Sequence, residues 1–157
     1  MAKKAVVYSV GTLRWHKGHE GEPCAEATLL ADGKKIADYA DDEHGGCARW
    51  NVIDHKAFDA FQKLAIKNHP DLSFEQADME MTEMVSIEHD VRKMRIDVNR
   101  GRTLFSLPAD IGLGYRTVNA PISPDVVAYL TAKYGTAIVI AHPDRLVEFA
   151  KTIAPKF

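Results

Sequence analysis

The sequence predicts an α+β fold in which a largely antiparallel sheet, beginning with an N-terminal three-stranded meander, packs against about four helices. Three features of the apolar pattern predict it: short apolar runs separated by turn residues up to position 41, two segments of helical spacing up to position 99, and alternating strand and helix patterns after that. The 157 residues, 46% hydrophobic and 27% charged, suit one globular core. We therefore expect a single domain over residues 1–157.

Short stretches of β-branched and apolar residues, bounded by turn-forming residues, predict three strands at the N-terminus. They are Lys3–Trp15, Glu22–Ala31 and Lys34–Asp41. The dipeptide Asp32-Gly33 is typical of a two-residue hairpin, because a type I′ turn needs positive φ at both central positions. This turn predicts that Leu29 faces Ile36 across the hairpin. It also leaves the charged Asp38 opposite Ala27.

Two amphipathic helices are expected next. Asp54 is typical of an N-cap, and the helix that follows it ends at the Asn-His-Pro sequence of residues 68–70. The second helix begins at a capping box formed by Ser73 and Gln76, and it runs to about Asn99. Its first half is acidic and its last half is basic, an order that the helix macrodipole favours.

The remaining third of the chain alternates strand and helix patterns. Ser123 and Pro124 are typical of an N-cap and of the first helical position, and Gly135 of the residue just past a helix end. The expected elements are a hairpin of Thr103–Leu107 and Tyr115–Val118, a helix from Ser123 to Tyr134, a buried strand at Ala137–Ala141 and a last helix opened by Pro143-Asp144.

Charge and cysteine content restrict the partners and the compartment. The formal net charge of −2 provides no overall basic field, which argues against a protein that coats nucleic acid nonspecifically. No apolar run approaches the length of a membrane span, so we expect no membrane association through one. Cys24 and Cys47 are too few for a disulfide framework. We therefore expect a cytoplasmic protein with free thiols.

Two pairs of metal-ligating side chains flank the expected meander. His16 and His19 follow its first strand, and His44 and Cys47 follow its third, so the four lie at the same end of the expected sheet. Zinc accepts imidazole and thiolate ligands in pairs two residues apart. The competing interpretation is that the histidines are hydrophilic turn residues and that Cys47 is a packed thiol. We favour the second interpretation and expect no metal or other cofactor.

The same region offers a nucleotide-binding hypothesis. Gly45 and Gly46 can expose successive backbone N–H groups to a phosphate, and Arg49 and Trp50 can clamp the phosphate and stack on a base. The three acidic residues at positions 41–43 oppose an anion there, and no Walker or dinucleotide motif is present. The competing interpretation is a glycine bend between strands, with Trp50 covering the core.

Four segments of the chain resemble small phage- and prophage-encoded proteins of uncharacterised activity. They lie at residues 25–35, 41–50, 102–107 and 120–135. The pattern to which they belong covers about two-thirds of the chain in order. The Gly-Gly-Cys loop at residues 45–47 and the Ser-Pro-Asp helix start at residues 123–125 are the most recognisable parts. The chain departs from the family at Asp41-Asp42-Glu43, where the relatives have Asn-Asp-Gly. The resemblance implies a phage-associated protein in the cytoplasm of a bacterial host.

The leading functional hypothesis is a noncatalytic binding protein. No hydrolase or nucleophile signature is present, and neighbouring acid and histidine residues on a strand point to opposite faces, so we expect no enzyme. Small phage accessory proteins commonly inhibit host factors, and by this analogy the partner is a host protein such as a nuclease or another antiphage defence component. The alternative is the nucleotide-binding module. Nucleic acid contact is possible but not favoured at the densest basic cluster, which consists of Arg92, Lys93, Arg95, Arg100, Arg102 and Arg116.

The expected partner surface combines both loops with an acidic helix face, because acidic residues on the long helix suit a basic surface on a partner. Its residues are His16, His19, Asp41, Asp42, Glu43, His44, Arg49, Trp50, Glu80 and Glu83.

Overall fold

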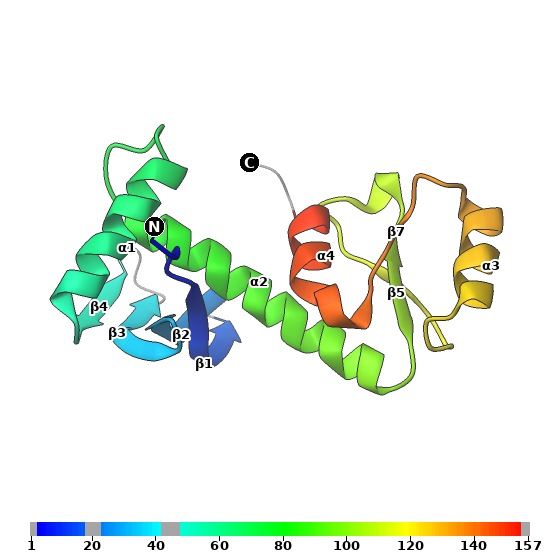
Figure 1. Ribbon diagram of the computed structural model, residues 1–157, viewed down its shortest axis with the longest axis horizontal. Coiled ribbons are helices and arrows are strands. Elements are labelled where there is room, and N and C mark those ends of the chain that lie inside the picture. Colours follow the sequence, from blue (N-terminus) through cyan, green and yellow to red (C-terminus); the bar gives the residue numbers. More distant parts are fainter. Residues whose placement is uncertain (1–2, 18–22, 42–47, 155–157) are drawn as a thin grey trace. The chain divides into compact units, whose positions relative to one another are not determined.

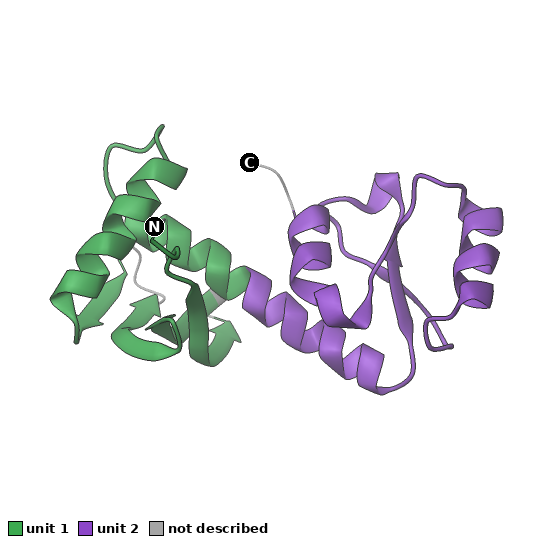
Figure 2. Cartoon of the chain, in the orientation of Figure 1, with its two compact units in different colours: residues 1–86 green, residues 87–157 purple. Residues whose placement is uncertain are grey.

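A computed structural model describes residues 3–17, 23–41 and 48–154. Antiparallel strands and four α-helices confirm the α+β class. The chain divides into two compact units, Met1–Ser86 and Ile87–Phe157 (Figure 2), and each unit is described by itself below. The single-domain organisation stays a prediction.

The first unit contains a four-stranded antiparallel meander in the order β1-β2-β3-β4 (Figure 1). Its strands are β1 (Tyr8–Lys17), β2 (Pro23–Ala31), β3 (Lys34–Asp41) and β4 (Arg49–Val52). The first three strands confirm the expected meander, and β4 is an addition to it. Helix α1 (His55–Asn68) follows, and α2 (Gln76–Asn99) contributes its first half to this unit.

The hairpin between β2 and β3 has the expected turn but not the expected register. Asp32 and Gly33 both have positive φ, at 48° and 81°, as a type I′ turn requires. An irregularity between Leu29 and Leu30 shifts the pairing by one residue, so Leu29 lies opposite Ala37 rather than Ile36.

The shift has a physical reason in the core. Ile36 and Ala37 are consecutive, yet both are buried, which is not expected of a regular strand in a sheet with one open face. The same shift moves Asp38 from the core face, where it would lie opposite Ala27, to the opposite face beside Thr28. The expected Asp38–Ala27 pairing is therefore wrong, and its correction removes a charge from the core.

One face of the meander packs against α1 and α2. Leu29 and Ile36 of the sheet are almost completely buried, as are Phe61 of α1 and Met81 of α2. The opposite face of the sheet carries polar residues, so the two faces alternate along each strand. This alternation positions the candidate site described below.

The starts of the two helices differ in how they are capped. The Asp54 carboxylate accepts from the Ala57 N–H at 3.0 Å, which confirms the expected N-cap of α1. The capping box expected for α2 does not form, because the Gln76 side chain donates to the Leu72 carbonyl at 2.7 Å instead. Glu75, with φ of 60°, directly precedes the helix, and its carbonyl accepts from the Met79 N–H.

The second unit has a three-stranded antiparallel sheet in the order β6-β5-β7. Its core includes Val91 and Met94 of α2, Leu104, and Phe149. The Ser123 hydroxyl accepts from the Val126 N–H, as expected for the cap of the third helix. The elements of this unit are β5 (Thr103–Ser106), β6 (Arg116–Val118), α3 (Pro124–Tyr134), β7 (Val139–Ile140) and α4 (Leu146–Ile153), with 3₁₀ turns at Pro108–Asp110 and Pro143–Arg145.

The Asp97 carboxylate, near the end of α2, links that helix to two later segments of the second unit through hydrogen bonds. Asp97 accepts hydrogen bonds from the Tyr115 hydroxyl at 2.8 Å and from the Arg102 guanidinium at 2.7 Å. The hydrogen bond from Tyr115, followed by that from Arg102, lowers the pKa of Asp97 below its ordinary value. Burial raises the pKa of Tyr115, and the bond to Asp97 raises it further. The folded state therefore favours the ionised carboxylate beside a protonated phenol.

We expect Tyr115→Phe to lower the free energy of unfolding by about 1 kcal/mol at neutral pH, because it removes one hydrogen bond to a charged group. A lowered folded-state pKa stabilises the fold above the ordinary value of 3.8 and loses that effect as pH falls through the lowered pKa. The difference between wild type and variant should therefore shrink in acid. Urea unfolding at pH 7 and pH 3 measures it, and a difference that grows in acid would contradict the assignment.

Candidate functional site

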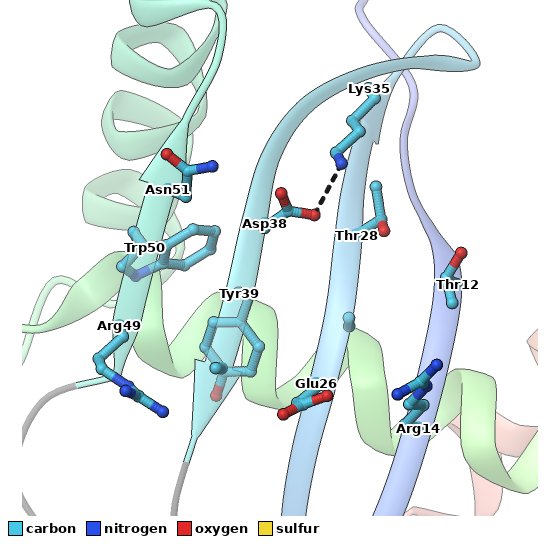
Figure 3. A pocket seen from close by; sticks show the side chains of 12 residues that line it. Thr12, Arg14, Glu26, Thr28, Lys35, Asp38, Tyr39, Arg49, Trp50 and Asn51 are labelled. Carbon is cyan, nitrogen blue, oxygen red and sulfur yellow. Dashed lines mark ion pairs between the residues drawn. The ribbon is translucent and has the colours of Figure 1, made fainter.

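The face of the first sheet that lies opposite the helices is polar, and we call it the open face. Its side chains line a shallow hollow of about 540 Å³ (Figure 3). The strands contribute them from alternate positions: Thr12, Arg14, Glu26, Thr28, Asp38, Ala40, Arg49 and Asn51.

One row of the open face crosses all four strands. Arg14 pairs with Glu26, Glu26 with Ala40, and Ala40 with Arg49. At a strand spacing of about 4.8 Å, the two arginine backbones lie about 14 Å apart. Figure 3 shows the Glu26 carboxylate between the two guanidinium groups. The row therefore has the charge order plus, minus, plus, and the small Ala40 side chain leaves space within it.

The next row of the open face is closer to neutral. Thr28 pairs with Asp38, and Asp38 pairs with Asn51. The Lys35 ammonium lies 3.0 Å from the Asp38 carboxylate, with roughly half of each side chain exposed. Such an exposed ion pair contributes little stability, about 0–1 kcal/mol, but it cancels the charge of both groups.

The aromatic residues of β3 and β4 face the core instead. The Trp50 ring centroid lies 5.0 Å from that of Tyr39 and 4.9 Å from that of Phe58. The Trp50 indole N–H donates to one Asp78 carboxylate oxygen at 2.7 Å, and the Ala48 N–H donates to the other at 2.9 Å. Because neighbouring strand residues alternate, this anchoring turns Arg49 toward the open face.

The residues expected at and around the two loops fall into three groups. His16 on β1, Asp41 at the end of β3 and Arg49 at the start of β4 lie at the same end of the sheet, as expected. The Trp50 ring packs against the core, as predicted by the alternative to nucleotide binding, in which Trp50 covers the core. The other loop residues, on which the nucleotide and zinc hypotheses depend, lie outside the described residues: His19, Asp42, Glu43, His44, Gly45, Gly46 and Cys47.

The two acidic residues expected on the helix lie away from the open face. Glu80 and Glu83 are on α2, and Glu80 contacts His69, which directly follows α1. From the sequence, His69 is only part of the Asn-His-Pro sequence at which the first helix is expected to end. Arg14 and Glu26 are not among the residues expected from the sequence, although their alternation with apolar neighbours on two strands is a usable signal.

Comparison with protein-family models, curated protein sequences and solved structures finds no match to this chain. Among the described residues, no helix has both the length and the apolar character needed to cross a membrane.

We expect Asp78→Ala to lower the free energy of unfolding by about 2–3 kcal/mol, because the Ala48 and Trp50 donors lose a charged, partly buried acceptor. Chemical denaturation followed by tryptophan fluorescence measures the loss. Asp59→Ala, at an exposed position of α1, is the matched control and should change stability by less than about 0.5 kcal/mol. Equal effects of the two substitutions would show that Asp78 does not anchor β4.

Proposed function

We propose that this protein is a noncatalytic, phage-associated binding protein that contacts and inhibits a host protein, and that the open face is its contact surface. The observation that supports this most directly is the row of Arg14, Glu26 and Arg49 across the sheet. The three charged side chains project from strands of one antiparallel sheet, so the hydrogen-bonded strands set the spacing of their backbones and no loop has to be ordered for it.

The charge pattern indicates the chemistry of the partner. Beside the paired Lys35 and Asp38, the open face presents the guanidinium groups of Arg14 and Arg49 and the carboxylate of Glu26. Arginine binds carboxylates through two parallel hydrogen bonds, and it is enriched at the energetic centres of protein interfaces. A complementary protein surface carries two acidic side chains, one for each arginine, with a hydrogen-bond donor or a basic side chain between them to meet Glu26.

The open face suits a protein better than a nucleic acid. Single-stranded nucleic acids bind through aromatic platforms, but Tyr39 and Trp50 direct their rings to the core side of the sheet. Glu26 and Asp38 also place carboxylates where phosphates would lie, which opposes backbone binding. A mixed-charge surface instead provides specificity between two proteins.

The double charge reversal Arg14→Glu/Arg49→Glu tests this proposal. Host proteins are retained on the immobilised wild-type chain, identified by mass spectrometry and purified, and Kd is then measured by calorimetry. We expect the reversal to raise Kd by about 100-fold or more, because two attractive pairs become repulsive. The matched control is Lys63→Glu/Lys67→Glu on exposed positions of α1, which makes the same change in net charge and should leave Kd within about threefold.

Three outcomes would overturn the proposal. A retained protein whose Kd responds equally to both double variants would place the interface elsewhere. Material that is retained through nucleic acid and lost on nuclease treatment would indicate a nucleic-acid-binding protein. A selective rise in the unfolding temperature with a nucleotide, in the absence of any retained protein, would favour the nucleotide-binding alternative.

A further inference from the structure

A histidine and two glutamates converge at the junction of α1 and α2. His69 directly follows α1, and Glu80 and Glu83 lie one helical turn apart on α2. One ligand atom from each of the three side chains lies within 4.8 Å of the other two. None of them is on the open face of the sheet, so this cluster is separate from the proposed contact surface.

The spacing of the donor atoms matches that of ligands around one metal ion. The His69 Nε2 atom lies 2.9 Å from a Glu80 oxygen and 3.7 Å from a Glu83 oxygen. Ligands about 2.1 Å from a tetrahedral zinc ion lie about 3.4 Å from one another, and the two distances bracket this value. The Glu83 side chain is 56% exposed, so its carboxylate has room to rotate toward the other two donor atoms.

Two of the three ligands are held in place by the surrounding chain. The side chains of His69 and Glu80 are only 13% and 14% exposed. The His69 backbone N–H donates to the Ala65 carbonyl and so fixes the residue at the end of α1. The Asn68 amide donates to the second Glu80 oxygen at 3.1 Å, which directs the first oxygen toward His69. Outer contacts of this kind orient the ligands of metal sites.

His69 Nε2 lies at hydrogen-bond distance from Glu80, 2.9 Å, while the Glu83 oxygen lies 3.7 Å from the same nitrogen, within ion-pair distance but beyond a hydrogen bond. Two carboxylates gathered around one imidazole repel each other, and the exposed Glu83 side chain can extend into water instead. A bound cation removes this repulsion, and it adds a link between the end of α1 and the middle of α2.

We propose that His69, Glu80 and Glu83 bind a divalent zinc ion. One imidazole and two carboxylates form a donor set that zinc accepts, and three protein ligands leave a fourth position for water. Magnesium and calcium prefer oxygen ligands alone, so the imidazole selects against them. The bound ion links the end of α1 to α2 within the first unit.

Zinc titration of the full chain, purified without an affinity tag and stripped with a chelator, tests this site. Calorimetry should show one ion per chain, and the unfolding temperature should rise with zinc but not with magnesium. Glu83→Gln should weaken zinc binding by at least about tenfold while leaving the circular dichroism spectrum unchanged, since Glu83 is the exposed ligand. The control Glu148→Gln, at an exposed position of α4, should bind zinc as the wild type does.

The alternative zinc ligands in the sequence are His16, His19, His44 and Cys47, and Cys47→Ser separates them from the proposed site. We expect Cys47→Ser to leave zinc affinity unchanged and a cobalt-substituted chain to lack thiolate-to-metal charge-transfer absorption. No heat of zinc binding, unchanged affinity in Glu83→Gln, or loss of zinc in Cys47→Ser would each overturn the proposal.

Discussion

The two hydrogen bonds that Asp78 accepts from Ala48 and Trp50 decide which side of β4 faces the core. A short strand has little sequence of its own to fix its orientation, and a one-residue slip would exchange its two faces. Because a carboxylate on α2 accepts from the indole N–H, Trp50 packs against the aromatic core and Arg49 points to the open face. The composition of the open face therefore depends on an anchor on the opposite side of the sheet.

Helix α2 contacts both the sheet and the end of α1 in the first unit, because side chains that repeat every 3.6 residues point to different sides of a helix. Asp78, Met81 and Val85 belong to the side that packs against the sheet. Glu80 and Glu83 lie on a different side and meet the end of α1. One helix thus supports the proposed contact surface and supplies two of the proposed zinc ligands. A substitution on one side of the helix should mainly affect the element that packs against that side.

Local signals predicted much of the fold, but not the long-range contacts. The turn at Asp32-Gly33 and the cap at Asp54 depend on residues close in sequence, and both are confirmed. Strand β4 has four residues, too few for a period of two to stand out. The register shift at Leu29 is set by core packing. The approach of His69 to Glu80 depends on how two helices pack, which no short motif records. Of the proposed contact row, only Arg49 was identified from sequence.

Arginine footprinting by mass spectrometry tests the central claim most directly. Phenylglyoxal modifies accessible guanidinium groups, so its reaction with the free chain can be compared with its reaction in the complex with the retained host protein. The account predicts that binding protects Arg14 and Arg49 and leaves the exposed Arg95 and Arg100 of the second unit as reactive as before. Protection of Arg95 and Arg100, with Arg14 and Arg49 unchanged, would contradict it.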